Sequence, residues 1–426
     1  MRLFPSVAIP LFCLTTIPAF AQNGPSVEEL HRIAKERAEK ILKEASGPVS
    51  ALMAQLEIPY DQDRSRIDTT IAEILKYKDL GVRALVQGLF APAGAPRGEN
   101  SARALARTTE AAVITEIELK VNTAPSEARR RMAWVLGRHA GERVIVILQK
   151  LLADPDMSVA SSAALSLGRL KHKESAFAIA EKLDKAPGWL GRSLLTALGD
   201  LEEPRVHPQI IAFLETPAAT ECVSAAAWAV KGIPARELLV PGLKLLLKWK
   251  GTPEDDLLLA QAVAAHVTVA DRDALVLMRR VLTEISAPRP VQEECAYALH
   301  FAKDANAKTW LLQDVNDKLK DNPDSEKLLR ERAKIYLRLK IHISAQKDYE
   351  SIRRLAKNRQ NNINLDGAFW IEFARSYAGT KTYQNAADCL RNAITLDTKS
   401  AAFKDYEEFA EMKKQAKFVA LFENND

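Results

Sequence analysis

The chain has 426 residues, of which 47% are hydrophobic, 6% are aromatic and 27% are charged, and its formal net charge is +5 at pH 7. This length exceeds that of one ordinary compact domain, whereas a repeat array can be this long because each unit contacts only its neighbours. The excess of basic side chains is too small and too dispersed for a typical nucleic-acid-binding protein, so a nucleic-acid partner is not expected. Few aromatic residues and many alanines and leucines favour packed helices over strands.

Residues 1–21 have the pattern of a cleaved secretory signal peptide. They contain a single basic residue, Arg2, then an apolar stretch from Val7 to Ile17, and then the small residues Ala19 and Ala21. Three prolines argue against the alternative of a buried helix. We therefore expect an exported bacterial protein, periplasmic or secreted. No later apolar run approaches the roughly 18 residues needed to span a bilayer.

Residues 22–124 are predicted to form degenerate helical repeats that cover the N-terminal end of an array. The first helix pair is expected over 27–56, where Ser26 and Glu29 form a capping-box pattern. Further helix pairs are expected over 67–90 and 102–121, on either side of a loop at 92–100. Terminal repeats are usually atypical, because one of their faces meets water.

A clear internal repeat begins near residue 125. Three segments align without gaps, and their glycines Gly137, Gly168 and Gly199 lie 31 residues apart. In the second copy, apolar residues at helical spacing predict one helix over 159–170 and another over 176–183, with a polar break at 171–174. The glycine either permits the turn between them or lets the second helix approach closely. Weaker copies continue to residue 321.

One copy carries a specific resemblance. The sequence Asp154-Pro155-Asp156, followed by Val159 and by the run AALSLG that ends at Gly168, resembles a HEAT repeat of the short bacterial type, which is also found in phycocyanobilin lyases. The resemblance implies an all-α fold, an alpha-alpha superhelix or solenoid of stacked helix pairs, over residues 125–321. Ala160 stands where the family usually has arginine, which weakens the expectation of a polar ladder along the array.

The pattern changes at residue 322. A set of residues between 370 and 393 has the spacing of a tetratricopeptide repeat, and an earlier copy lies 41 residues upstream, so residues 322–398 resemble two such repeats. Thr398 replaces the proline usual near the end of that repeat. Residues 399–426 are expected to form a capping helix or a pair of helices. The later set is Trp370, Phe373, Ala374, Tyr377, Ala386, Leu390 and Ala393; the earlier is Leu329, Arg332, Ala333, Tyr336, Ala345 and Tyr349.

The cysteines and histidines give no sign of a catalytic, cofactor-binding or metal-binding site. Three cysteines follow the signal peptide, each on a separate expected helix, and we interpret them as buried hydrophobic residues: Cys222, Cys295 and Cys389. Four histidines fall near predicted turns and are interpreted as solvated: His139, His172, His266 and His300. The sequence has no H-E-x-x-H motif.

The catalytic motifs of other enzyme classes are missing as well. There is no His-Glu dipeptide of the kind that binds iron in deoxyhypusine hydroxylase, and no nucleophile elbow, phosphate-binding loop or dinucleotide-binding motif. The acidic run from Glu254 to Asp256 is interpreted as the start of a helix, where negative charge is favourable. We therefore predict no cofactor and no enzymatic activity.

The most concentrated positive charge lies between Lys327 and Arg359, a segment that contains eleven basic residues and three acidic ones. A polyanion or an acidic protein partner could dock there, although the alternative is a solvated helix face. A smaller run, Arg129 to Arg131, is interpreted as solvated. The candidate partner-binding face comprises Arg338, Lys340, Lys347, Arg353, Arg354, Lys357 and Arg359.

The sequence thus predicts a non-catalytic exported scaffold that binds protein or peptide partners on a helical-repeat surface. One alternative is a lyase-like HEAT enzyme that acts on a chromophore or a modified side chain. Another is a structural spacer in the cell envelope. The partner and the oligomeric state stay open.

Overall fold

The computed structural model describes residues 47–423, except 110, 234, 249–251, 285 and 359–364. Within these residues every regular element is an α-helix or a 3₁₀ helix, and there is no strand. Of the helices described, none combines the length and the apolar character needed to cross a membrane. The expected signal peptide, the capping box at Ser26 and most of the helix pair predicted over 27–56 lie outside the described residues.

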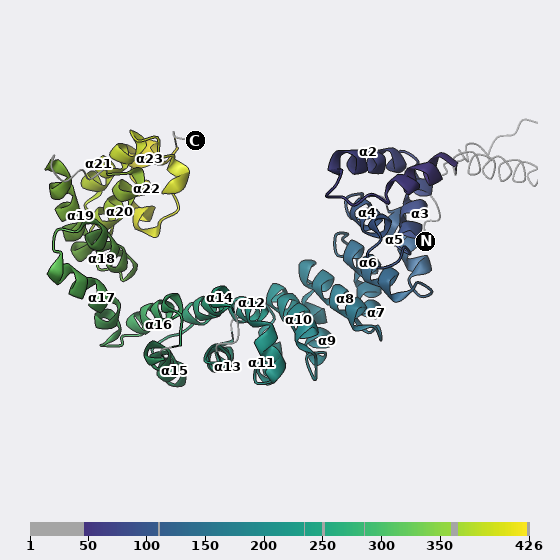
Figure 1. The fold of residues 1–426 in the computed structure, drawn as a ribbon, viewed down its shortest axis with the longest axis horizontal. Helices are drawn as coiled ribbons and strands as arrows, with labels where there is room; N and C mark the ends of the chain where they lie inside the picture. The colour runs from purple at the N-terminus through teal and green to yellow at the C-terminus, as the bar shows by residue number, and fades with distance from the viewer. Residues whose placement is uncertain are drawn as a thin grey trace, which may run out of the picture. The chain divides into compact units, whose positions relative to one another are not determined.

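The fold is an alpha-alpha superhelix of stacked helix pairs, and it divides into two compact units, Met1–Ala235 and Arg236–Asp426 (Figure 1). The helices of the first unit are α2 (Arg64–Leu75), α3 (Lys78–Gly88), α4 (Pro96–Leu105), α5 (Ala112–Lys120), α6 (Ser126–Leu136), α7 (Glu142–Leu152), α8 (Met157–Arg169), η1 (Lys173–Ser175), α9 (Ala176–Glu181), α10 (Gly188–Leu201), η2 (Pro204–Val206), α11 (His207–Leu214), η3 (Pro217–Glu221) and α12 (Val223–Gly232).

The second unit begins with a short 3₁₀ turn and ends in two short helices. Its helices are η4 (Arg236–Leu238), α13 (Leu239–Leu246), α14 (Pro253–Ala264), α15 (Arg272–Thr283), α16 (Arg289–Phe301), α17 (Ala307–Asp321), α18 (Glu326–Arg338), α19 (His342–Lys357), α20 (Gly367–Gly379), α21 (Tyr383–Ile394), η5 (Ser400–Ala402), η6 (Glu407–Phe409), α22 (Ala410–Lys413) and α23 (Ala416–Glu423).

Helix starts follow the capping signals of the sequence. The carboxylate of Asp156 accepts a hydrogen bond from the backbone N–H of Ser158 at 2.8 Å and caps α8, as the Asp-Pro-Asp break predicts. One prediction is wrong, because α4 begins at Pro96, inside the loop expected over 92–100. Proline is tolerated in the first helical turn, where its missing N–H has no partner to lose.

The glycines at the 31-residue period act by close helix packing. Gly137 has a φ of −62°, which any residue adopts, so it does not permit a special turn. A Cβ on Gly168 would lie 2.9 Å from the Cα of Ala197, and one on Gly199 would lie 2.9 Å from the backbone oxygen of Trp228. Both contacts are with the first helix of the next pair. The prediction that the glycine lets the second helix of its own pair approach closely is therefore wrong.

Within the first unit the first helices α6, α8, α10 and α12 lie in one row, and the second helices α7, α9 and α11 lie in another (Figure 1). The turn between the two helices of a pair is made a few residues after the glycine. Lys171 has a φ of 55° and Glu202 a φ of 54°, in the left-handed region that L residues adopt only at a cost. These two residues also lie one repeat apart.

Arg131 is buried, which corrects its interpretation as a solvated residue. Its side chain is 1% exposed, and its Nη1 donates to the backbone oxygens of Leu89 at 2.9 Å and Ala91 at 2.5 Å. Nη2 donates to the oxygen of Pro92 at 3.0 Å, and Nε donates to Glu99 at 3.0 Å. Arg131 therefore ties α6 to the end of α3 and to the start of α4.

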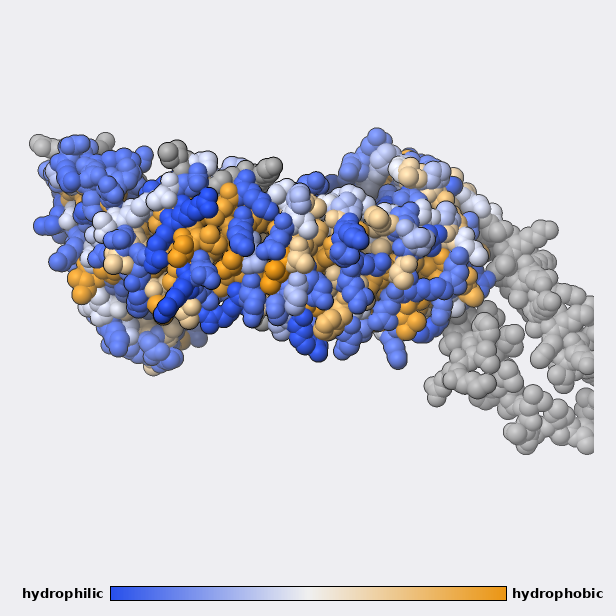
Figure 2. Space-filling view, turned by 90° about the horizontal axis from the view of Figure 1, so that it is seen from below, coloured by the Kyte–Doolittle hydropathy of each residue, from blue (hydrophilic) through white to orange (hydrophobic). Residues whose placement is uncertain are grey.

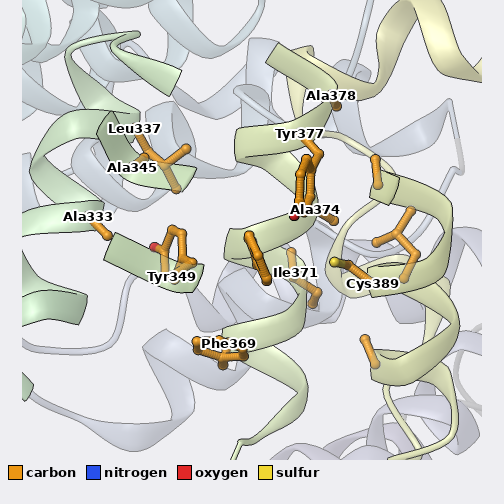
Figure 3. Close-up of a cluster of buried hydrophobic side chains, with 14 of the residues drawn as sticks. Ala333, Leu337, Ala345, Tyr349, Phe369, Ile371, Ala374, Tyr377, Ala378 and Cys389 are labelled. Atoms are coloured by element: carbon orange, nitrogen blue, oxygen red, sulfur yellow. The ribbon is translucent and has the colours of Figure 1, made fainter. Parts of the chain in front are cut away.

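The core of the second unit contains most of the positions that define the two repeats predicted over 322–398. Leu329, Ala333, Ala345 and Tyr349 of the first copy are buried. Six of the seven residues of the second copy are also buried, and Trp370 packs partly buried against the same cluster. Figure 3 shows Tyr349 and Leu337 beside Ile371, Ala374 and Tyr377 of α20. The helix pairs α18–α19 and α20–α21 thus bury most of the positions that carry the spacing, and their assignment to tetratricopeptide repeats stays a prediction.

The helices on either side of residue 322 pack within one unit. Leu339, at the end of α18, joins a buried cluster with Ala296, Tyr297 and Leu311 of α16 and α17. At the C-terminus, where a capping helix or a pair was expected, the chain forms the short helices α22 and α23. Phe409, the last residue of η6, is fully buried, so this segment packs on the core.

The three cysteines are free and buried, as expected. Burial raises the pKa of the thiol to about 11 in Cys222 and to about 12 in Cys295 and Cys389, so all three carry their proton at neutral pH. The interpretation of His139 is wrong: it is only 9% exposed, and its Nε2 lies 2.9 Å from the backbone oxygen of Leu105.

Candidate partner-binding surfaces

Much of the basic segment predicted as a docking face is paired with carboxylates of neighbouring helices. Arg330 on α18 contacts Asp366 and Glu372 at 3.0 Å each. Lys334 contacts the same Glu372 at 3.3 Å, while Arg332 pairs with Asp348 at 2.7 Å. These ion pairs join α18 to α19 and α20 and cancel part of the local positive charge.

Two of the predicted face residues are paired in the same way. The Nη2 of Arg338 lies 2.5 Å from Glu294 on α16, and its guanidinium lies 3.8 Å from the centre of the Tyr297 ring. The Nζ of Lys340 lies 2.8 Å from Glu407. Arg338 and Lys340 therefore hold neighbouring helices together in this structure.

The remaining described residues of the predicted face lie on α19. Lys347, Arg354 and Lys357 are exposed, and Lys347 and Arg354 line a hollow of about 450 Å³. The guanidinium of Arg353 is half-buried, 5.6 Å from the centre of the Phe373 ring. Arg359 lies outside the described residues. The predicted face is thus reduced to one helix, and its role in binding stays a prediction.

A second surface, which the sequence interpretation missed, lies in the first unit. A hollow of about 410 Å³ is lined by three consecutive first helices, α6, α8 and α10. Its lining residues come in columns with the 31-residue spacing of the repeat: Trp134, Leu165 and Thr196 form one column, and Arg138, Arg169 and Asp200 form another. We call it the Trp134 hollow.

The Trp134 hollow is positively charged at one end. The guanidinium of Arg138 lies over the Trp134 ring, 3.5 Å from its centre, and its pKa is lowered by burial and by the nearby charge of Arg169. Within the described residues, neither arginine has a carboxylate at salt-bridge distance. At the other end, Asp200 accepts a hydrogen bond from the indole N–H of Trp228 at 3.1 Å.

Large hydrophobic side chains are exposed on the same row of first helices. Leu165 is 37% exposed, Trp189 50% and Trp228 48%. On the face of the molecule in Figure 2, hydrophobic side chains lie in strips between rows of hydrophilic ones, as expected for amphipathic helices packed side by side.

The acidic run at 254–256 does mark a helix start. Thr252 caps α14 by accepting a hydrogen bond from the backbone N–H of Asp255 at 3.1 Å. Asp256 is buried, and this burial, with the neighbouring charge of Asp255, raises its pKa to about 6. Within the described part of the chain, no group of three or more histidine, cysteine or acidic side chains is placed to hold a metal ion.

Comparison with known proteins identifies the repeat in the first unit. Residues 117–199 match the family model for HEAT repeats. This segment contains α6, α8 and most of α10, and therefore most of the Trp134 hollow. No curated protein matches the sequence.

Two known structures are similar to this chain. A crystal structure of a Kap121p mutant has a TM-score of 0.48 at 10% sequence identity, over 90% of this chain and 52% of that one. A homology model of the full-length AP-3 complex in an intermediate open conformation has a TM-score of 0.42 at 12% identity, over 89% of this chain and 74% of that one. The chain spans about half the length of the Kap121p chain.

Proposed function

We propose that this chain is a non-catalytic scaffold that binds protein or peptide partners on the exposed faces of its helix pairs. The observation that carries the proposal is the row of first helices in the first unit, which exposes Leu165, Trp189 and Trp228 beside two arginines without carboxylate partners in the described chain. Tryptophan and arginine dominate the energetic centres of protein interfaces. Stacked helix pairs offer extended surfaces on which such residues can recognise a partner at several points.

The proposal also covers the types of repeat and the export of the protein. We assign α18–α19 and α20–α21 to tetratricopeptide repeats, on the support of their residue spacing and buried faces. The HEAT repeats of the first unit belong to the short type that is also found in phycocyanobilin lyases. Export to the periplasm or beyond rests on the signal-peptide pattern of residues 1–21.

A photo-crosslinking pair tests the scaffold function in the cells that make the protein. Benzoylphenylalanine is introduced at Leu165, on the first-helix row, or at Phe177, which is 40% exposed on the second helix α9. The expected result is a defined protein adduct from position 165 and little or none from position 177. Equal adducts at both positions, or none at either, would contradict binding on the first-helix row.

A charge reversal tests whether the α19 residues take part. The triple change Lys347→Glu, Arg354→Glu and Lys357→Glu alters exposed side chains only, and it spares the half-buried Arg353. We expect it to reduce capture of an acidic partner from the cell envelope about tenfold or more without changing the melting temperature.

The matched control for this reversal changes three other exposed lysines of the second unit, Lys308, Lys327 and Lys399, to Glu. It alters the net charge of the unit by the same amount and should leave capture unchanged. Equal losses in the two triple variants would indicate a general charge effect, and unchanged capture in both would remove α19 from the binding surface.

A further inference from the structure

We propose that the Trp134 hollow binds one acidic side chain of a partner peptide, with its carboxylate between Arg138 and Arg169 and a neighbouring apolar side chain against Trp134 and Leu165. This inference rests on the proposed scaffold function and names the chemistry of the segment that the first unit recognises.

The repeat itself brings the two guanidinium groups together. Arg138 and Arg169 occupy the same position in consecutive copies, at the ends of α6 and α8, and these first helices pack closely because Gly137 leaves no room between them for a side chain. Two like charges held at adjacent positions repel each other, and an anion placed between them relieves that repulsion. Each guanidinium can bind a carboxylate with two parallel N–H groups.

The hydroxyl groups of Ser166 and Thr196 in the hollow already donate to backbone oxygens. The hydroxyl of Ser166 donates to the backbone oxygen of Ala133 at 2.8 Å, and that of Thr196 donates to the oxygen of Arg192 at 2.8 Å. Arg138 gives one N–H to the oxygen of Trp134, at 2.9 Å, and a guanidinium has five. The ammonium of Lys171 is also engaged, with the backbone oxygen of Asp200 and with Glu202. The arginines therefore supply the charged donors for an incoming carboxylate.

The other walls of the hollow limit what the anion can be. Trp134 and Leu165 present apolar surface, which favours a side chain or backbone with apolar neighbours. At the far end, the ammonium of Lys171 donates to the backbone oxygen of Asp200 and pairs with Glu202, so with the carboxylate of Asp200 this end has no net positive charge to offer a second anionic group. A polyphosphate or a nucleic-acid backbone is therefore disfavoured. A volume of about 410 Å³ suits one or two residues of a peptide. A single carboxylate in an otherwise apolar segment fits all three features.

Arg138 is also held in place before the partner arrives. Its guanidinium stacks on the Trp134 ring at 3.5 Å, and the same side chain is tied to the backbone of its own helix. A donor that is already ordered loses less entropy when it binds. Arg169 is exposed and completes the pair from the neighbouring helix.

The test uses the full mature chain and a phage-displayed library of random decapeptides. The expected result is enrichment of peptides with Asp or Glu next to an aromatic or aliphatic residue. For a fluorescein-labelled copy of the most enriched peptide, the double variant Arg138→Gln and Arg169→Gln should raise Kd about tenfold or more. The same peptide with its acidic residue changed to the amide should lose affinity to a similar extent.

A control variant removes two charges elsewhere in the first unit, Lys173→Gln and Lys182→Gln, and should leave Kd within about twofold, while the conservative Arg138→Lys and Arg169→Lys pair should retain part of the binding. Peptides that bind equally well to the double glutamine variant would overturn this inference and leave the scaffold function standing. A failure to enrich any peptide, together with the absence of an adduct at position 165, would overturn both. Stronger binding of a labelled oligonucleotide or of polyphosphate than of the peptide would also overturn the assignment to a carboxylate.

Discussion

The buried guanidinium of Arg131 offers the sharpest test of what holds the first unit together. Replacing it with methionine keeps an unbranched side chain of similar length in the core but removes all five donors. The backbone oxygens of Leu89 and Ala91 then lose their buried hydrogen bonds, and each such loss costs about 1 to 3 kcal/mol. Of the two carboxylate partners, Glu99 is 51% exposed and can be hydrated instead, and Glu127, which is 27% exposed, keeps its ion pair with Arg130. We expect a loss of about 3 to 4 kcal/mol in the free energy of unfolding.

The neighbouring Arg130 provides the matched control. Its side chain is 34% exposed, and it also pairs with Glu99 and Glu127, so Arg130→Met removes a partly solvated ion pair worth at most about 1 kcal/mol. Arg131→Lys retains the charge, but a single ammonium group cannot bond all the backbone oxygens that the guanidinium reaches. The stability of this variant should therefore lie between those of Arg131→Met and Arg130→Met.

Urea unfolding followed by circular dichroism measures the three variants, and hydrogen exchange locates the effect. Exchange should accelerate in the backbone amides of α3, α4 and the loop between them, and it should be unchanged in α20 and α21. The reasoning is refuted if Arg131→Met and Arg130→Met lose the same stability, or if exchange accelerates uniformly along the chain.

Three further changes test local features of the fold. Gly168→Ala places a methyl group 2.9 Å from the Cα of Ala197 and should cost about 1 to 3 kcal/mol in urea unfolding, whereas Gly47→Ala meets nothing within 4 Å and should not destabilise; equal effects would argue against close helix packing. Asp256→Asn should add about 2 kcal/mol of stability near pH 7.5 and little near pH 4. The buried carboxyl, whose pKa is raised to about 6, favours folding while it is protonated and loses that contribution as the pH rises through 6. A difference in stability that does not depend on pH would contradict this. Lys381→Gly should add about 1 kcal/mol in a thermal melt because Lys381 has a φ of 61°, and a loss of stability would show that its side chain contributes more than the strain costs.

Sequence periodicity was sufficient for the local structure of the repeats. The break before Asp156 and the polar residues after Leu170 mark the ends of α8, because capping and helix-breaking residues act over a few positions. The 31-residue spacing of the glycines was also sufficient to find the repeat. Its physical cause was assigned to the wrong neighbour, because a single copy does not reveal which helix packs against the glycine.

Long-range contacts explain the errors of interpretation. Arg131 belongs to a run of three arginines that looks solvated, and its acceptors lie about 40 residues away, in a loop that carries no matching signal. His139 is buried for a similar reason, against the carbonyl of Leu105. The charge of Arg338 is paired by Glu294, which stands 44 residues earlier, so the excess counted between Lys327 and Arg359 overstates the charge that a partner would meet.

The Trp134 hollow carried a signal that could have been found. Trp134 and Leu165 occupy one column of the aligned repeats, and Arg138 and Arg169 occupy another, four positions further on. Residues that recur on the polar side of consecutive first helices must lie side by side once those helices form a row. The sequence alone does not show that Arg138 would stack on Trp134, because that depends on the rotamers of both side chains.

The glycines of the first-helix row also have a mechanical consequence. They bring α6, α8, α10 and α12 into extensive contact with one another, whereas α7, α9 and α11 touch their counterparts far less. Because the first helices pack more closely than the second helices, the stack of helix pairs must curve toward the first helices. The bend of this unit is therefore encoded by residues without side chains. A methyl group at Gly137, which would meet Ser166 of α8, would push α6 and α8 apart, flatten the bend and widen the gap between Arg138 and Arg169.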